Sequence, residues 1–231
     1  MHPEHPASAG TLWPSSNELP LTHQCAILKI VNRTVLLLAL STSLFAADPH
    51  MTPEERTKAL NYLAESRKEY LAAIEGVSVE QWKWKPTPAR WSVGETAEHI
   101  VLAEALLFDF VQKAVASPAN PAWEEQTKGK TEFIEKVMAP RMGKAQAPEP
   151  IVPTGGLTQA QVKERFEKQR AAIEKFAAET EVPLKEHTAE HPFKVFSTLN
   201  GYQWLIYIPL HTERHDKQIA EVKATEGYPA Q

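Results

Sequence analysis

Three short patterns mark the starts of long helices, and they constrain the fold more than any other feature of this sequence. Thr52, Ser92 and Thr158 are each followed three residues later by Glu or Gln. This is the spacing of a capping box, in which two side chains satisfy the first free backbone N–H groups of a helix. Pro53 suits the first helical turn. Each pattern opens a long stretch with apolar residues at helical spacing, which predicts amphipathic helices.

These helices define the expected fold class. We expect the first helix over residues 53–74, with Gly76 ending it, and the second over residues 93–116. The third runs from the cap at Thr158 to about residue 179, and a fourth covers about 200–225. The sequence contains neither internal repeats nor convincing strands. We therefore predict an all-α protein, a four-helix bundle with a long crossover connection.

The crossover is the segment 117–153, which is rich in Pro, Lys and Gly and contains one helical stretch at about 131–139. A connection this long in a compact domain is usually functional or disordered. It would also allow the second and third long helices to run parallel, which a short loop does not permit.

A second connector covers residues 181–196 and is interrupted by Pro183 and Pro192. His187 and His191 lie in it. Because Pro192 disfavours a helix there, these two histidines are not expected to share a helical face. We expect both to be exposed and do not count them as ligands.

Three tryptophans, Trp82, Trp84 and Trp91, lie close together around Pro86 and Pro88, which prevent a helix in this stretch. We interpret the cluster as a packed plug across one end of the bundle. The alternative is a platform on which a ligand stacks.

The last predicted helix carries His211 and His215, which are four residues apart and therefore lie on one face. Tyr207, Ile208 and Ile219 share that face, so the histidines should point toward the core. Two inward imidazoles need polar partners. Either they bind a common metal ion, or each donates a hydrogen bond to a carbonyl or carboxylate group.

His99 is the third candidate ligand, because it lies at the edge of the apolar stripe on the second predicted helix. The alternative is a solvent-exposed histidine at the boundary of that helix. With His211 and His215 it would supply three neutral nitrogen ligands. Three protein ligands leave coordination positions open for water or a substrate, as in catalytic metal sites. Imidazoles suit zinc, nickel, iron or copper and do not choose among these divalent transition metals.

Ligating imidazoles also need outer hydrogen-bond partners, and the candidates are Gln218, Glu95 and Tyr207. Glu213 lies between the two histidines of the last helix, where protease patterns such as H-E-x-x-H do not place a glutamate. We expect Glu213 to point away from the ligands and do not assign it as a general base. The sequence contains no G-x-S-x-G elbow.

Composition excludes several other functions. The net charge is −4 and no Lys/Arg cluster forms a basic stripe, so nucleic acid is not an expected partner. The single cysteine, Cys25, excludes an intrachain disulfide and a thiolate zinc cluster. No glycine-rich phosphate loop is present.

The first fifty residues differ from the rest. Residues 1–26 are rich in Pro, Ser and His and lack periodicity, so we expect them to be unstructured and the true start to lie later. Residues 27–47 combine Lys29 and Arg33 with a short apolar run and small residues, the layout of a secretory signal peptide. The run is short for a transmembrane helix. We expect a periplasmic or secreted protein with no stable membrane span after cleavage. The alternative is a cytoplasmic protein that starts at Met51.

Two segments carry a resemblance to a known family. Trp91-Ser-Val-Gly-Glu-Thr-Ala-Glu-His99 resembles the W-S-x-x-E-x-x-x-H segment of the DinB family of DinB/YfiT-like metalloenzymes. His211-Thr-Glu-Arg-His-Asp-Lys-Gln-Ile219 resembles the signature of the family's final helix, H-x-x-x-H-x-x-Q-I. The similarity covers roughly residues 53–224.

The resemblance implies a four-helix bundle domain at residues 51–226 and a metal site made of His99, His211 and His215. Characterised members of the family include transferases and isomerases that use low-molecular-weight thiols such as bacillithiol or mycothiol. Those thiols are cytosolic, so an exported chain departs from the family in this respect.

We therefore expect an exported metal-dependent enzyme, a hydrolase or transferase that acts on a small molecule. Its pocket should be lined by Trp204, Tyr207 and parts of the first two helices. The alternative is a non-catalytic bundle that binds a metal or a small ligand. A homodimer would be compatible with either function, since helical bundles often leave an apolar face.

Overall fold

The computed structural model describes residues 47–138, 140 and 145–230, so the predictions for residues 1–26 and for the leader before Ala47 lie outside the described residues. The chain from Ala47 onward forms one compact unit. Its elements, in chain order, are α2 (Pro53–Ile74), α3 (Val79–Lys83), α4 (Val93–Ala116), α5 (Trp123–Thr127), α6 (Lys130–Met138), η1 (Glu149–Ile151), α7 (Gln159–Glu179), β1 (Thr188–Glu190), β2 (Thr198–Asn200) and α8 (Gly201–Lys223). No helix among the described residues has the length and apolar character needed to cross a membrane.

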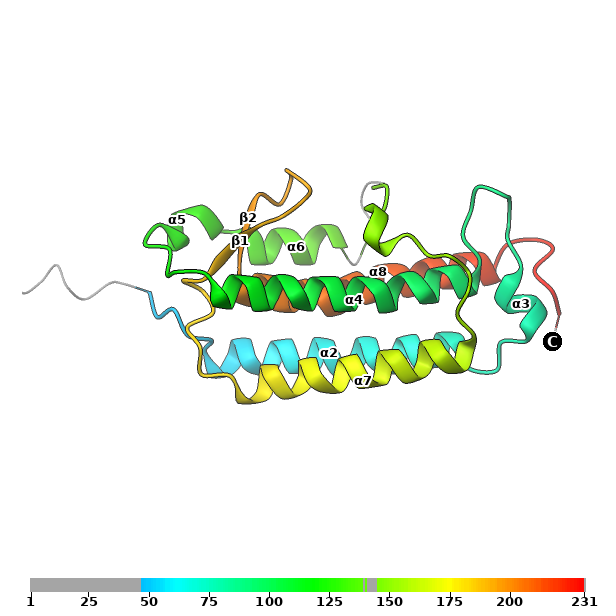
Figure 1. Ribbon diagram of the computed structural model, residues 1–231, viewed down its shortest axis with the longest axis horizontal. Coiled ribbons are helices and arrows are strands. Elements are labelled where there is room, and N and C mark those ends of the chain that lie inside the picture. Colours follow the sequence, from blue (N-terminus) through cyan, green and yellow to red (C-terminus); the bar gives the residue numbers. More distant parts are fainter. Residues whose placement is uncertain (1–46, 139, 141–144, 231) are drawn as a thin grey trace, which may run out of the picture. The chain divides into compact units, whose positions relative to one another are not determined.

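The long helices α2, α4, α7 and α8 lie side by side (Figure 1). Helix α8 packs against α2 and α4, and α7 packs against the same two helices, so α2 and α4 lie diagonally opposite each other. The colours in Figure 1 show that α4 and α7 run in the same direction, as expected for helices joined by a crossover. The all-α class is confirmed.

Capping boxes open the long helices, because they satisfy N–H groups that have no partner within the helix. The boxes predicted at Thr52, Ser92 and Thr158 form before α2, α4 and α7. A further box, made by Asn200 and Gln203, opens α8. The capping boxes thus set the residue at which each long helix begins. They thereby also determine which side chains of neighbouring helices lie at the same level along the bundle.

The core consists of two apolar clusters, one in each half of the bundle. Between them lies a polar layer, which we define as Ser66, Glu104, Arg170 and Thr212. The buried Arg170 guanidinium donates hydrogen bonds to the Leu63 carbonyl at 2.5 Å and the Ser66 hydroxyl at 2.6 Å. It also pairs with Glu104 and lies 3.2 Å from the Thr212 hydroxyl. The layer joins all of the long helices at one level.

A β-hairpin lies above the bundle, so the expectation that no strand forms is wrong. Strands β1 and β2 are antiparallel, with Thr188 opposite Asn200. Each has only three residues, too few for apolar alternation to reveal a strand. The side chain of Lys130 on α6 donates hydrogen bonds to the carbonyls of Phe196 and Thr198, at 3.0 and 2.6 Å. The hairpin and α6 are thereby joined on the same side of α8.

His191, expected to be exposed, is buried at 8 % exposure. Its ring stacks on Trp204 with ring centroids 4.9 Å apart, and its Nδ1 accepts a hydrogen bond from the Phe193 N–H at 2.9 Å. Burial lowers the pKa of His191 from 6.5 to about 4. His187 is half-buried and donates a hydrogen bond to the Ser117 carbonyl. The hairpin fold, rather than a helix, determines the position of both rings.

The three tryptophans of the cluster lie in two places, and the ligand-stacking alternative stays a prediction. Trp82 is buried and its indole N–H donates a hydrogen bond to the Leu157 carbonyl, and Trp84 contacts Tyr228 edge-on near the C-terminus. These two close one end of the bundle. Trp91 instead lies beside His99, with ring centroids 4.8 Å apart.

Candidate metal centre

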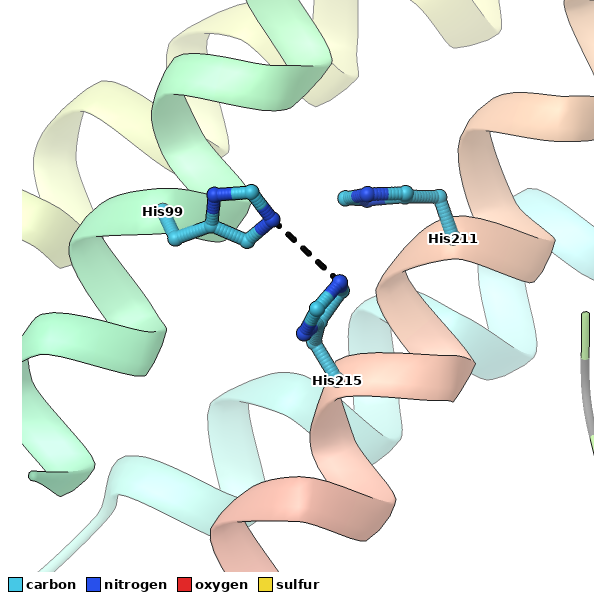
Figure 2. Close-up of side chains that lie close together, drawn as sticks. All are labelled: His99, His211 and His215. Atoms are coloured by element: carbon cyan, nitrogen blue, oxygen red, sulfur yellow. Dashed lines mark hydrogen bonds between the residues drawn. The ribbon is translucent and has the colours of Figure 1, made fainter. Parts of the chain in front are cut away.

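The structure brings the three predicted histidines together. His99 projects from α4, and His211 and His215 project from successive turns of α8 (Figure 2). One nitrogen from each ring lies within 4.8 Å of the others. The Nε2 atoms of His99 and His215 are 3.2 Å apart, although the residues are separated by 116 positions in the chain. The predicted cluster is present, and metal ligation by it remains a prediction.

Hydrogen bonds from the Nδ1 atoms fix the orientation of two of these imidazole rings. The Nδ1–H of His215 donates a hydrogen bond to Gln218 Oε1 at 2.9 Å, which is the predicted partner. The Nδ1–H of His99 donates to the Ile151 carbonyl at 2.7 Å. Glu95, the predicted partner of His99, instead completes a capping box and pairs with Lys85 at 2.9 Å.

The third outer partner was predicted to be Tyr207. Its ring stacks against His211, with centroids 6.2 Å apart, and among the described residues no hydrogen bond joins the two side chains. The Nδ1 atom of His211 is buried without a hydrogen-bond partner in the part of the chain that the structure describes. Tyr207 therefore packs against the centre and does not orient it by hydrogen bonding.

The protonation pattern of His99 and His215 follows from these contacts. A neutral imidazole carries one N–H, and in both rings that hydrogen is on Nδ1 because the partner is a carbonyl or amide oxygen. Both Nε2 atoms then present lone pairs to each other across 3.2 Å, the contact marked by the dashed line in Figure 2. Two lone pairs at this distance repel unless a proton or a cation lies between them.

The donor set fits a divalent transition metal better than a proton. Bonds of about 2.0–2.1 Å to a tetrahedral ion place neighbouring imidazole nitrogens roughly 3.3 Å apart, close to the observed separation. Burial lowers the pKa of His99, against a weaker opposing effect of the Ile151 carbonyl. Burial also holds the pKa of His211 well below its usual value, with added repulsion from His215 and His99. The neutral, metal-binding form of these rings is therefore favoured.

A pocket of about 1050 Å³ lies over the histidines. Its apolar walls come from α6, the crossover and the hairpin loop, and include Phe133, Val137, Ile151, Val152, Phe193 and Phe196. The predicted lining is only partly right. Tyr207 faces the pocket, but Trp204 is fully buried beneath it and α2 contributes no lining residue. Sequence periodicity gives no sign of these walls, because they belong to connecting segments.

Acidic groups are absent from the lining among the described residues. Glu213 pairs with Lys217 at 2.8 Å on the outer side of α8, so it points away from the ligands as expected. The polar part of the site therefore consists of three imidazoles, the Gln218 amide, Arg90 and Arg214, with apolar walls above them. Such a site can hold a cation on its nitrogens and exclude water from the space next to it.

Comparisons with known proteins identify the family of this chain. The sequence profile of the DinB superfamily matches residues 62–219. The chain is 25 % identical over 160 residues to the uncharacterized protein YuaE of Bacillus subtilis (strain 168), covering 69 % of this chain and 93 % of that protein. No solved structure matches the chain. With a profile match that includes all three clustered histidines, this chain belongs to the DinB superfamily.

Proposed function

We propose that this protein is a metal-dependent enzyme, a hydrolase or transferase, that acts on a small molecule held next to a three-histidine centre. The observation that carries the proposal is the 3.2 Å separation between the Nε2 atoms of His99 and His215. A bound zinc, nickel or iron ion would supply Lewis-acid chemistry at this position. Superfamily membership and the position of the cluster beneath a large pocket support the same function.

The residues of the chain would perform three tasks. The Ile151 carbonyl and the Gln218 amide keep Nδ1 of two ligands protonated, so Nε2 stays available for bonding. The apolar walls keep water away from the reacting part of the substrate. Tyr207 packs against His211 and limits movement of that ring.

A second function, binding without catalysis, is favoured by one observation. The described lining of the pocket contains no carboxylate, so it offers no Asp or Glu as a general base beside the candidate ligands. In this alternative the centre would hold a metal ion or a small ligand without turning it over.

The location of the protein is also a proposal. The signal-peptide pattern at residues 27–47 supports a periplasmic or secreted protein. N-terminal sequencing of the mature protein tests this, because export predicts a start close to residue 48, whereas a cytoplasmic protein would start at Met51. A homodimer stays compatible with the proposal, and sedimentation measurements would reveal it.

Metal content tests the proposed centre. Mass spectrometry should find about one equivalent of a transition metal per chain in the purified protein and none in a His211→Ala/His215→Ala variant. His187→Ala is the matched control, since this histidine lies outside the cluster and should leave the metal content unchanged. No metal in the wild type after reconstitution with zinc, nickel and iron would refute the metalloenzyme function.

Turnover separates the two functions. Hydrolytic and group-transfer substrates should be converted by the metal-loaded protein and not by the variant lacking both α8 histidines. Stoichiometric metal without turnover of any compound in the screen would favour the binding function.

A further inference from the structure

We propose that the ligand of this pocket is an amphipathic anion, with one negatively charged head group at the histidines and a larger apolar body against the walls. The inference rests on the proposed function, because it places the head group at the three-histidine centre. It adds the chemical class of the substrate. Three independent features of the pocket support it: its mouth, its walls and its charge.

The mouth of the pocket exposes apolar side chains to solvent. The large apolar residues that are exposed in the described part of the chain are Val79, Val152 and Val195, at 74, 46 and 67 %. Val152 in the crossover and Val195 in the hairpin loop both line this pocket, whereas Val79 lies on α3 away from it. Exposed apolar residues gathered at a site mark a surface that binds an apolar partner. Here the two residues come from different connecting segments that meet at one opening.

The walls extend this apolar character inward. Phe133 on α6 packs against Phe196 of the hairpin loop with ring centroids 5.7 Å apart, and Phe193 lies in the same loop. The volume of about 1050 Å³ lies just above the range for small-molecule sites, roughly 300–1,000 Å³. A small polar metabolite would leave most of these walls facing water. An acyl chain or a fused aromatic body would cover them.

Charge sets the sign of the head group. Arg90 and Arg214 line the pocket, and the described lining includes no Asp or Glu. Arg90 also forms a long ion pair of 3.8 Å with Glu221, which lies outside the lining, and such a solvent-exposed pair is weak. Arg214 lies one helical turn from His211, and Arg90 precedes Trp91, whose ring contacts His99. A cation on three neutral imidazoles would add further positive charge. An anionic head group is therefore attracted to the histidine end of the pocket, and a cationic head group is repelled from it.

Calorimetric titration of the metal-loaded full chain with hexanoate, octanoate and decanoate tests this class. Affinity should rise about fourfold for each added CH₂, the gain expected from burying a methylene group. Decyltrimethylammonium has an alkyl chain one carbon longer and a positive head, and it should fail to displace decanoate. Equal affinity along the series, or displacement by the cation, would overturn the inference.

Matched variants locate the binding. Val195→Asp, which puts a charge at the mouth, should weaken decanoate binding at least tenfold, and Val79→Asp should leave it unchanged. Arg90→Ala should weaken decanoate several-fold, with the exposed Arg165→Ala as its control. An equal response to Val195→Asp and Val79→Asp would overturn the assignment to this pocket.

The His211→Ala/His215→Ala variant separates this inference from the proposed function. Removing the centre should lower the affinity of every alkanoate while keeping the dependence on chain length. If the wild type binds no metal but shows that dependence, the metalloenzyme function fails and the apolar-body inference holds. If metal is present and chain length has no effect, the inference fails and the metal centre stands.

Discussion

The Glu98 carboxylate accepts two hydrogen bonds from Thr154, one from the backbone N–H at 3.0 Å and one from the hydroxyl at 2.8 Å. Thr154 follows Ile151 by three residues, and the Ile151 carbonyl holds the ring of His99 at 2.7 Å. Because Glu98 and His99 are neighbours on α4, the crossover is attached twice to the same turn of that helix. The Glu98–Thr154 pair therefore holds the Ile151 carbonyl in place, and this carbonyl orients the candidate ligand His99.

Thr154→Val should weaken metal binding about tenfold. Loss of a hydrogen bond that supports a metal ligand typically lowers metal affinity by about 10- to 100-fold, and this contact is one step removed from the ligand. The substitution keeps the shape of the side chain and removes the 2.8 Å hydroxyl contact to Glu98. Competition with a chromogenic chelator measures the metal dissociation constant.

Thr154→Ser is the matched control, because it retains the hydroxyl and should bind metal like the wild type. The absorption spectrum of bound cobalt adds a readout of ligand geometry, which should change in Thr154→Val. Identical spectra and affinities in all three proteins would show that the pair does not position His99.

Removing the metal should destabilise the protein, since an ion that binds only the folded state stabilises it by mass action. At a free metal concentration a hundredfold above the dissociation constant, the contribution is about 2.7 kcal/mol. For a chain of this size that corresponds to a fall in Tm of about 8 °C on adding a chelator. Scanning calorimetry of the His211→Ala/His215→Ala variant should show no change with chelator. A chelator-dependent Tm in that variant would place the ion elsewhere.

Arg170→Met should lower the free energy of unfolding by about 3–5 kcal/mol, because it leaves Glu104 as a buried carboxylate without its cation. Urea unfolding measures the loss. Arg165→Met, on the exposed side of α7, should change stability by less than about 0.5 kcal/mol.

A double variant, Glu104→Leu/Arg170→Met, tests whether the loss comes from the unpaired charge. It should recover much of the lost stability, since replacing both members of a buried pair by apolar residues is often neutral. A double variant that is less stable than Arg170→Met would show that Glu104 contributes through its bond with Thr212 instead, which is 3.0 Å long.

His191 should make the protein less stable in acid. Its pKa is about 4 in the folded state against 6.5 ordinarily, so the unfolded chain takes up a proton first as the pH falls. The contribution of the neutral ring is complete above pH 6.5, declines below it and is lost as the pH falls to about 4. The difference between the two pKa values corresponds to about 3 kcal/mol.

His191→Phe removes this titration and keeps an aromatic ring beside Trp204. Urea unfolding at pH 7.5 and 4.5 should show the wild type losing about 2.5 kcal/mol more than the variant over this interval. Groups common to both proteins cancel in the comparison. Equal losses in the two proteins would contradict the assignment.

Local signals explain what the sequence predicts well. Capping boxes are short and carry their own hydrogen bonds, so α2 and α4 begin and end where the pattern places them. The i, i+4 spacing of His211 and His215 needs only helical geometry to define a shared face. Gln218 as the partner of His215 follows from the same helix.

Long-range contacts explain what the sequence does not predict. The partner of His99 is a backbone carbonyl, and a carbonyl has no sequence signature. Arg170 is fully buried on α7 because its long side chain reaches Glu104 on α4, and an arginine carries no sequence sign of such burial. The burial of His191 depends on a hairpin whose strands are too short to be recognised.

The division between the floor of the pocket and its walls has a consequence for how such a chain can diversify. The histidines and the polar layer belong to helices whose positions are fixed by their mutual packing, whereas the walls belong to the crossover and the hairpin loop. Insertions and substitutions accumulate most easily in connecting segments. Substitutions at Val152, Val195 and their neighbours could therefore change which small molecules fit the pocket, while the helices that carry the three histidines stay the same from one descendant to the next.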